Sequence, residues 1–472
     1  MKPATNLLFV FSDQQRYTAL GANGNKVVQT PNLDSMAAQG MVCDNMFSNH
    51  PLCSPFRAIL LTGRYGFKNG VIDNEYEPFR NIPTLPGILS KAGYHTGHIG
   101  IWHLGHGPYH DDNRYGYDYM AAVEGIGGNY FDQSYWENEV GPIKREGWTP
   151  AVETDLAINF MQKHKLERPN EPFALFLSWR PPHWGYSNYP KKYSGYNPED
   201  IDLPGNVPEQ MADFARKEIA DYYSCCSGLD DQMGRLLNAL AKLKLEEDTL
   251  VCYSSDHGDH LSSHGYGKPY DTFMHWSLRG SKGTPYDESA HVPFLIRWPG
   301  KTPKGSRCDV HMGTIDIAPS LLSACGVTTP EGLQGRDISC VWRGERAPVE
   351  TSLTPGANDS VYLMNMANGW PRRPAWMGDW RGVRTARYTY ARWYKHERGP
   401  WLFDREQDPL EMHNIAFSKS AKPIVEEMEA RLHRWMEATG DPFEYGKRGP
   451  LGFLDVGQRW ANPERYKDVS TC

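Results

Sequence analysis

The sequence contains no hydrophobic run that approaches the length of a membrane-spanning helix. Its nine cysteines are an odd number, and they show neither zinc-type spacing nor an evident disulfide framework. The apolar run near the start, from Leu7 to Phe11, is too short for a secretory signal peptide. From these absences we expect no membrane partner and a location in the cytoplasm.

An excess of one charge sign is also missing. The formal net charge is −7 over 472 residues and is spread over both halves of the chain. This balance argues against nucleic acid or an anionic membrane surface as a partner, and binding of a small anion would need a local basic site. Aromatic residues are abundant, at 12% of the chain. Most aromatics serve as core, but they also line pockets for sugars and other flat ligands.

Short apolar runs that end in acidic residues indicate the strands of a parallel sheet. Residues 6–11 and 249–255 are two such runs, and Asp13 and Asp256 follow them. Ligands of parallel sheets bind beyond the carboxyl ends of the strands, where both acidic residues would lie. Further apolar runs occupy 173–178 and 292–298, and helical spacing occurs at 84–91, 152–164, 210–243 and 315–325. This alternation predicts an α/β fold with a mostly parallel central sheet flanked by helices.

The chain exceeds the size at which one hydrophobic core usually stops growing, so we expect more than one unit. Residues 388–394 alternate like a half-exposed strand, and a helix is expected over 422–438. We predict a large α/β domain over 1–350, a smaller C-terminal α+β subdomain with an antiparallel sheet over 351–440, and a C-terminal arm over 441–472. There is no internal repeat or low-complexity segment.

A cysteine stands ahead of a proline at a predicted helix start, in the stretch Cys53-Ser54-Pro55-Phe56-Arg57. The positive end of the helix dipole would stabilise a polar or anionic form of Cys53, and Pro55 suits a first helical turn. Arg57, four residues on, would share the same helix face. A lone cysteine of this kind is more often a buried structural residue, so the surrounding residues decide between the two interpretations.

The stretch that begins at Cys53, together with Leu61-Thr62-Gly63-Arg64, resembles the signature of the formylglycine-dependent sulfatases, which belong to the alkaline-phosphatase-like superfamily. Other segments fall in the order that the family has: Thr30-Pro31-Asn32-Leu33-Asp34, Gly93-Tyr94-His95-Thr96, Trp102-His103-Leu104-Gly105, Lys282-Gly283-Thr284-Pro285-Tyr286-Asp287-Glu288-Ser289, Val292-Pro293 and Asp408-Pro409-Leu410-Glu411.

The resemblance implies an alkaline-phosphatase-like sandwich and an enzyme that hydrolyses the sulfate ester of a carbohydrate or another small alkyl sulfate. It also implies that a maturation enzyme reads Pro55 and Arg57 and oxidises Cys53 to formylglycine. The family usually has a small residue where Phe56 stands. Over 1–350 the large domain would then be the catalytic sulfatase domain.

The resemblance further implies a divalent-metal site. Asp13, Gln14, Asp256 and His257 match the family's ligands, and the oxidised side chain of residue 53 would be a further ligand. Hard oxygen donors suit Ca²⁺ best, while Mn²⁺ and Mg²⁺ stay open. Many sulfatases have Asp-Asp and Asp-Asn at these places. The Asp-Gln and Asp-His pairs of this chain also look like those of phosphonate monoester hydrolases and of some carbohydrate and choline sulfatases.

Four residues match catalytic positions of the family. In the mechanism that the resemblance implies, one hydroxyl of the hydrated aldehyde attacks sulfur, and loss of a proton from the other later expels sulfate. Arg57 would stabilise the gem-diol, with His103 as its base partner. His183, in Arg180-Pro181-Pro182-His183, would be the general acid beside the leaving oxygen, and Lys282 would clamp the sulfate oxygens.

One position departs from the family. Gly100-Ile101-Trp102-His103 has isoleucine where the family commonly has lysine, so another cation would have to neutralise the sulfate. The candidates for this cation are Lys268, Arg372 and Arg373. Lys268 also competes with Lys282 for the clamp, and Lys282 is preferred because a tyrosine- and acid-containing run follows it. Residues expected to bind the substrate are His264, Lys268, Arg372, Trp376 and His396.

Two other functions stay open. One is a phosphonate monoester or phosphodiester hydrolase on the same scaffold; such enzymes also lack the lysine but tend to lose the following histidine, so the retained His103 favours a sulfate ester. The remote alternative is a non-catalytic protein with an unmodified Cys53, which the intact ligand pairs disfavour. Formation of a homo-oligomer is left open.

Overall fold

The computed structural model describes residues 5–74, 76–123, 128–265, 282–348, 358–366, 379–393 and 400–443. Within these ranges, no helix combines the length and the apolar character that crossing a membrane requires. Most of the predicted C-terminal arm, residues 444–472, lies outside them.

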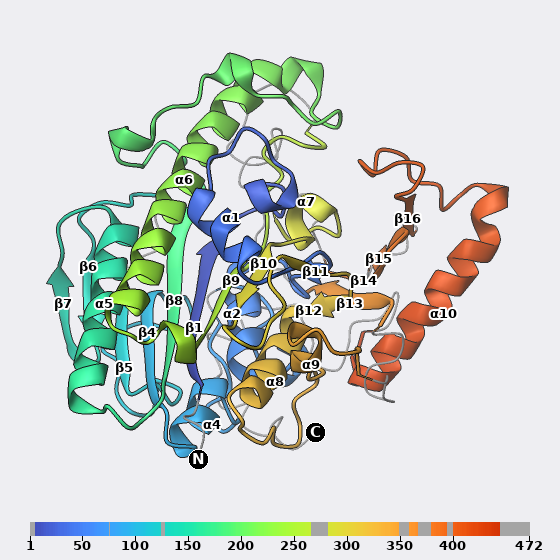
Figure 1. Cartoon of the computed structure of the whole chain (residues 1–472). Helices are drawn as coiled ribbons and strands as arrows, with labels where there is room; N and C mark the ends of the chain where they lie inside the picture. The colour runs from blue at the N-terminus through green and yellow to red at the C-terminus, as the bar shows by residue number, and fades with distance from the viewer. Residues whose placement is uncertain are drawn as a thin grey trace, which may run out of the picture.

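A ten-stranded sheet forms the centre of the molecule (Figure 1). Its strands, in spatial order, are β11 (Ser306–Cys308), β2 (Met41–Cys43), β10 (Phe294–Arg297), β9 (Thr249–Ser255), β1 (Asn6–Asp13), β8 (Phe173–Pro182), β4 (His95–Ile101), β5 (Tyr119–Val123), β6 (Ser134–Glu137) and β7 (Val140–Lys144). The central run from β9 to β5 is parallel, whereas β10, β6 and β7 run antiparallel to their neighbours. The predicted α/β class with a mostly parallel sheet is therefore confirmed.

Strand β1 shows why the sheet is covered on both faces. Its side chains are buried throughout, with Leu7, Phe9 and Phe11 in one apolar core and Leu8 and Val10 in the other. Burial of each such side chain contributes about 2 kcal/mol. Helices α2 (Cys53–Thr62), α4 (Leu85–Lys91) and α8 (Thr314–Ala324) pack into the first core; α1 (Pro31–Ala38), α5 (Thr149–Glu167) and α6 (Ala212–Lys242) pack into the second.

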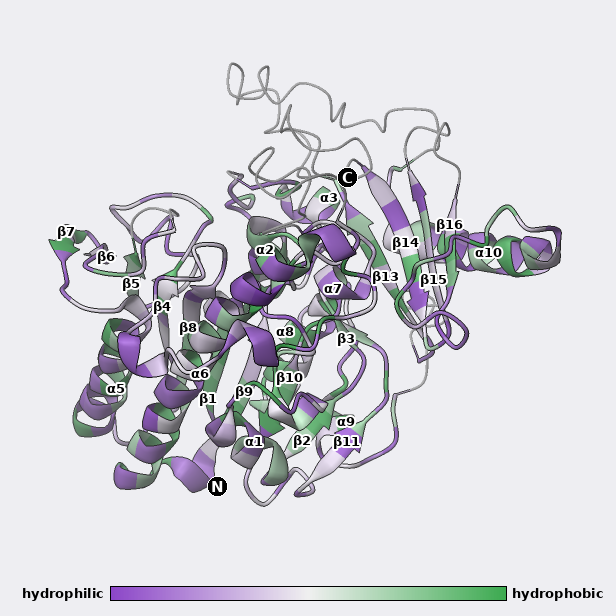
Figure 2. Ribbon diagram, turned by 90° about the horizontal axis from the view of Figure 1, so that it is seen from above, coloured by the Kyte–Doolittle hydropathy of each residue, from purple (hydrophilic) through white to green (hydrophobic). Residues whose placement is uncertain are grey.

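A smaller antiparallel sheet stands beside the large one (Figure 2). It consists of β13 (Ser360–Asn365), β14 (Trp380–Thr385), β15 (Tyr388–Trp393) and β16 (Trp401–Asp404), and α10 (Lys422–Thr439) packs on it. The strand and helix expected over 388–394 and 422–438 are thus confirmed as β15 and α10. Hydrogen bonds join this sheet to the larger unit; among them, Met364 N–H donates to the Asn49 carbonyl (2.8 Å), and Trp380 Nε1–H donates to the Gly283 carbonyl (2.9 Å).

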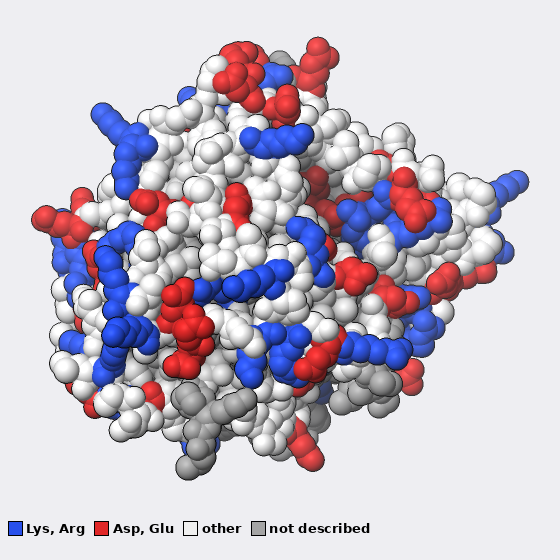
Figure 3. Space-filling model, viewed as in Figure 1, with Lys and Arg blue, Asp and Glu red and all other residues white. Residues whose placement is uncertain are grey.

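The remaining elements are short. They are β3 (Met46–Phe47), β12 (Met312–Gly313), α3 (Gly66–Asn69), α7 (Asp287–Ala290), α9 (Ser339–Trp342) and the 3₁₀ turns Gly21–Asn23, Lys191–Tyr193, Pro198–Asp200, Glu209–Met211, Glu246–Asp248 and Lys419–Ala421. On the face shown in Figure 3, basic and acidic side chains are interspersed. Exposed ion pairs of the described residues include that of Lys192 with Asp231.

Candidate active site

The carboxyl ends of β1 and β9 bring two aspartates together. The strands pair in parallel up to Ser12 and Ser255, so Asp13 and Asp256 emerge side by side at one sheet edge. Asp256 is held there by backbone donors, because the N–H groups of Gln14 (2.9 Å) and His257 (2.8 Å) both bind its Oδ1. The sequence-based expectation for this edge is therefore realised in the geometry.

Four buried side chains form a candidate cation-binding cluster. Asp13, Cys53, Asp256 and His257 each offer one ligand atom, and these atoms lie within 4.8 Å of one another. Nε2 of His257 lies 3.7 Å from Asp13 Oδ1, 3.5 Å from Asp256 Oδ1 and 3.3 Å from Cys53 Sγ. We call these four residues the cation cluster. All four are candidate ligands from the sequence as well.

Cys53 is the first residue of α2, which begins after the extended residue Leu52. The side-chain oxygen of Asn74 accepts the Ser54 N–H (3.0 Å) at this helix start. Burial, followed by the nearby charge of Asp13, raises the pKa of Cys53 to about 12. Burial and Asp13 thus outweigh the helix dipole that was expected to stabilise an anionic cysteine, and the unmodified side chain is a neutral thiol.

Arg57 lies one helical turn after Cys53 and is buried against the cluster. Its Nη2 binds Asp13 Oδ2 (3.0 Å) and Asp256 Oδ2 (3.3 Å). Its Nη1 donates to the Ile101 carbonyl (2.7 Å) and to the Ser178 hydroxyl oxygen (2.6 Å). The guanidinium thus neutralises part of the charge of the two carboxylates and links them to the end of β4 at Ile101 and to Ser178 within β8.

Lys282 contacts the cluster through Cys53. Its Nζ lies 3.0 Å from Cys53 Sγ, 3.1 Å from Gln14 Oε1 and 2.9 Å from His183 Nε2. Burial opposes its charge, but the carboxyl groups of Asp13 and Asp256 raise the pKa of Lys282. Lys282 is therefore a protonated, half-buried cation at the place where an anion would meet the cluster.

The two aspartates respond differently to this environment. Burial acts to raise the pKa of Asp13, yet the neighbouring cations Lys282 and Arg57 hold it well below its usual range. For Asp256, burial and the charge of Asp13 raise the pKa to about 8. Buried like charges this close cannot both ionise without a further cation. A divalent ion would supply that charge, so the site fits one.

The donor chemistry also fits a hard cation. Carboxylate oxygens of Asp13 and Asp256 and the amide oxygen of Gln14 are the ligands that Ca²⁺ and Mg²⁺ prefer, and His257 adds an imidazole. Burial, with Lys282 as the second cause, holds the pKa of His257 well below its usual range, so its ring is neutral and able to bind a metal.

His183 and His103 approach from two other elements. His183 follows β8 directly, and burial and Lys282 hold its pKa well below the usual range. The backbone of His103 adopts φ 58° just after β4, and its carbonyl accepts the Ser54 hydroxyl (2.7 Å). His103 therefore lies against the start of α2.

Ile101 and Phe56, the two departures from the family pattern, both have packing partners. Ile101 packs with Val123 and Tyr135 in a small apolar cluster, and its side chain is buried. Phe56 is fully buried, with its ring 5.8 Å from that of Phe11. Both positions therefore serve as core in this chain.

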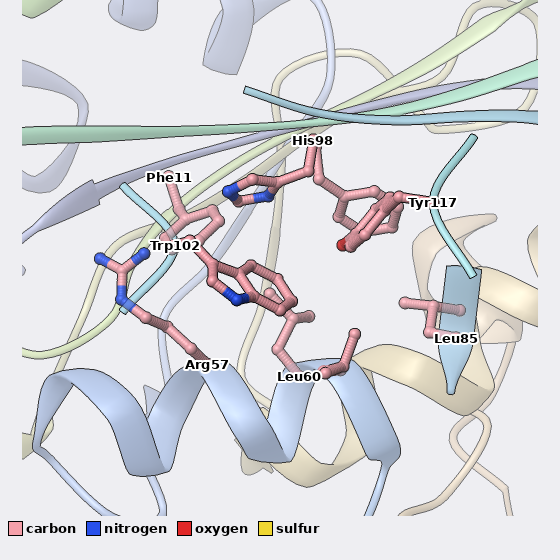
Figure 4. A pocket seen from close by; sticks show the side chains of 9 residues that line it. Phe11, Arg57, Leu60, Leu85, His98, Trp102 and Tyr117 are labelled. Carbon is pink, nitrogen blue, oxygen red and sulfur yellow. The ribbon is translucent and has the colours of Figure 1, made fainter. Parts of the chain in front are cut away.

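A small cavity lies beside Arg57, which is one of its lining residues (Figure 4). It is lined by Phe11, Arg57, Leu60, Leu61, Leu85, His98, Trp102, Tyr117 and Phe176. Its volume of about 20 Å³ corresponds to roughly one water molecule. The cavity is therefore too small to bind a sugar.

The expected substrate-binding residues are only partly described. His264 stacks on Tyr286 with ring centroids 3.9 Å apart, and its Nε2 lies 3.2 Å from Asn206 Nδ2 and 3.5 Å from Glu288 Oε2. Its imidazole is thus engaged within the protein. Outside the described residues lie Lys268, Arg372, Arg373, Trp376 and His396.

Two residues of this region were not found from the sequence. Ser178 binds Arg57, and the only sequence signal for it is its place at the end of the predicted strand 173–178. Tyr186 donates its hydroxyl to Asp259, and no motif points to it. Both depend on contacts between segments that are distant in the sequence.

Known proteins resemble this chain in sequence. Residues 5–327 match the family model described as Sulfatase, and residues 281–438 match that described as N-sulphoglucosamine sulphohydrolase, C-terminal. An ulvan-active sulfatase from Formosa agariphila is 32% identical over 451 residues, covering 93% of this chain and 82% of the relative. An N-acetylglucosamine-6-O-sulfatase from Bacteroides thetaiotaomicron is 24% identical over 525 residues, covering 93% and 88%.

Among solved structures, one of a protein in complex with its substrate D-glucosamine-2-N,6-O-disulfate superimposes with a TM-score of 0.82. It is 22% identical and covers 95% of this chain and 100% of that chain. At this identity the likeness concerns the fold.

Proposed function

Because the chain belongs to the sulfatase family, we propose that it hydrolyses the sulfate ester of a carbohydrate with an oxidised Cys53 and a divalent cation. The observation that carries this proposal is the position of Cys53. Its Sγ lies between Lys282 Nζ (3.0 Å) and His257 Nε2 (3.3 Å), beside two carboxylates.

The electrostatics disfavour the cysteine itself as the nucleophile. With a pKa of about 12, the thiol of Cys53 is protonated at neutral pH, and a thiol is a poor nucleophile. Formylglycine, when formed at this position, supplies hydroxyl oxygens as nucleophile in place of sulfur. The Sγ atom marks where the first side-chain heavy atom beyond Cβ would lie.

Asp13, Gln14, Asp256 and His257 would hold the cation, most favourably Ca²⁺. When bound, the cation supplies Lewis-acid polarisation of the sulfate oxygens. Arg57 keeps Asp13 and Asp256 in position through its two Nη2 contacts.

Lys282 and His183 act on the substrate side of the cluster. Lys282 binds the sulfate oxygens with its ammonium group. His183 is neutral and accepts from Lys282, so it is placed to pass a proton from the ammonium to the leaving oxygen. His103 serves as a base partner at the start of α2.

A carbohydrate substrate is supported by the relatives. One relative is named an N-acetylglucosamine-6-O-sulfatase, and the solved structure with TM-score 0.82 holds a sulfated glucosamine as its substrate. The proposal transfers this substrate class, and no particular sugar, to the present chain.

The test uses matured enzyme and two esters of the same hydroxyl group of one sugar, a sulfate and a methylphosphonate. We expect a clear preference for the sulfate in kcat/KM, and loss of both activities in Cys53→Ala. A preference for the phosphonate would instead make the chain a phosphonate monoester hydrolase. The Asp-Gln and Asp-His pairs and Ile101 are the features that support this alternative. Activity that survives Cys53→Ala would contradict a function of Cys53 in the reaction.

A further inference from the structure

The residue after Lys282 is held between the loop before Cys53 and the smaller sheet. Gly283 N–H donates to the Pro51 carbonyl (2.9 Å), and the Gly283 carbonyl accepts the Trp380 Nε1–H (2.9 Å). Pro51 stands two residues ahead of Cys53, and Trp380 is the first residue of β14. The backbone that follows Lys282 is therefore bonded to two other segments of the chain.

These two bonds fix the course of the chain directly after Lys282. The Gly283 N–H belongs to the peptide unit shared with Lys282, and the Gly283 carbonyl belongs to the next unit. Gly283 itself has φ 78°, in the left-handed region that glycine adopts readily and other residues do not. The turn is thus held at both of its peptide units. We call residues 283–287 the clamp segment.

Trp380 has the surroundings of a rigid anchor. Its side chain is fully buried in an apolar cluster with Phe47 of β3, Ala290 of α7 and Trp393 of β15. A ring that is packed in this way keeps its N–H in one direction, and a buried indole N–H requires an acceptor. The Gly283 carbonyl is that acceptor.

The same strand holds the other end of the clamp segment, at Asp287. Arg384 Nε donates to Asp287 Oδ1 (3.1 Å), and Arg405 also binds this carboxylate. The Asp287 N–H donates to Glu411 Oε2 (3.1 Å). Trp380 and Arg384 stand four residues apart in β14, so their side chains lie on one face of the strand. This face of β14 therefore holds both ends of the clamp segment.

We propose that Trp380 is a positioning residue, which places the ammonium of Lys282 at the cation cluster by holding the Gly283 carbonyl. A lysine ammonium stands on a flexible four-carbon stem, so a fixed backbone limits the positions that it can take. Lys282 needs such a limit, because its Nζ meets three polar atoms at distances between 2.9 and 3.1 Å. A displacement of about 1 Å at a reacting site can cost about 10²-fold in rate.

Trp380→Phe tests the proposal, because it removes the N–H donor and keeps an aromatic ring. Trp342→Phe is the matched control, since Trp342 is also fully buried, in the first core beside Phe294. Both variants lose an indole from an apolar core, so a general loss of stability would affect both. Trp380→Phe also takes the indole donor from the Gly283 carbonyl.

The first measurement is amide hydrogen exchange of the cation-free, unmodified protein, followed at the Gly283 N–H. We expect exchange about two- to tenfold faster in Trp380→Phe than in Trp342→Phe, because loss of one hydrogen bond makes local opening of the clamp segment easier. Equal exchange in these two variants would overturn the proposal.

Arg384→Gln perturbs the same segment from its other end and leaves Trp380 intact. It removes a charged partner of Asp287, and we expect the Asp287 N–H to exchange at least about threefold faster. Arg387→Gln is its control, because Arg387 follows the same strand and pairs with Asp404. Equal exchange in these two variants would overturn the hold of β14 on the clamp segment.

The second measurement is kcat/KM for a sugar sulfate, and only this one rests on the proposed function. A double-mutant cycle combines Trp380→Phe with Lys282→Met in the matured enzyme. We expect Trp380→Phe to lower kcat/KM about tenfold where Lys282 is present, and less than about twofold in Lys282→Met.

Equal losses in both backgrounds would overturn an effect of Trp380 that acts through Lys282, because a merely structural residue lowers activity whether or not the lysine is present. If the wild-type protein hydrolyses no sulfate ester, the proposed function fails, whereas the exchange rates still decide whether Trp380 holds the clamp segment.

Discussion

The ammonium nitrogen of Lys282 lies 2.9 Å from Nε2 of His183, and Lys282 therefore donates a hydrogen bond to a neutral imidazole. This relationship gives Lys282 two tasks, because the same group also lies 3.0 Å from Cys53 Sγ. It fixes the lone pair of His183 toward the cluster, and it supplies the positive charge that an anionic substrate requires.

Lys282→Met should therefore impair catalysis strongly. Loss of one electrostatic stabiliser costs about 10²- to 10³-fold in rate, and we expect a fall of this size in kcat/KM. The acidic limb of the pH profile should also move to higher pH, because the imidazole of His183 loses a neighbouring cation that lowers its pKa. Lys192→Met is the control, since Lys192 is exposed and pairs with Asp231. Similar kinetics of the two variants would argue against the function assigned to Lys282.

Arg57→Met should destabilise the protein by about 3 to 5 kcal/mol, because it leaves Asp13 and Asp256 buried without their partner. Urea denaturation of the cation-free protein measures this change. Arg80→Met provides the comparison: Arg80 pairs with Glu77 and Asp112 at the surface, and its loss should cost less than about 1 kcal/mol. Equal costs would show that the contacts of Arg57 contribute little.

Glu153→Gln should change how stability depends on pH. Glu153 is fully buried, and burial raises its pKa from 4.5 to about 8 in the folded protein. Its contribution to stability is fully present below pH 4.5 and is lost as the pH rises to 8, because the unfolded chain ionises Glu153 in this range while the folded protein retains the proton.

The Glu153→Gln variant cannot ionise at this position, so its stability relative to wild type should increase between pH 5 and pH 8, by up to about 3 kcal/mol at pH 7. Denaturation curves at several pH values measure this difference. Glu167→Gln, an exposed change on the same helix, should give a difference that does not vary with pH. A flat difference for Glu153→Gln as well would refute the raised pKa.

Removal of divalent cations should lower both activity and Tm, and Ca²⁺ should restore them. The stabilisation by bound ligand follows its concentration relative to Kd and reaches about 2.7 kcal/mol at a hundredfold excess. Asp13→Asn should abolish the Ca²⁺-dependent rise in Tm, because it removes a carboxylate of the cluster. A Tm that does not respond to chelator or Ca²⁺ would contradict a cation at this site.

Much of the site could be predicted from the sequence, because it is built at the ends of elements that have local signals. The runs before Asp13 and Asp256 are apolar enough to identify strands, and parallel strands end at one edge. The start of α2 at Cys53 follows from the proline that comes after it. The antiparallel direction of β10 was not predictable, since an apolar run carries no sign of its direction.

The buried polar network could not be predicted, for a physical reason. Ser178 binds Arg57 across 121 positions of sequence, and Gln14 binds Asp259 across 245. Such pairs depend on where the ends of different strands meet, and no local pattern encodes that. The same holds for Ile101, whose carbonyl contributes to the site while its side chain packs in the core.

The most direct test of the account is the mass of the peptide that contains Cys53, from protein made together with a formylglycine-generating enzyme. We expect the mass of the aldehyde or its hydrate, and sulfatase activity in proportion to the converted fraction. An unchanged thiol in protein that nevertheless hydrolyses sulfate esters would contradict the central claim that oxidised Cys53 is the nucleophile.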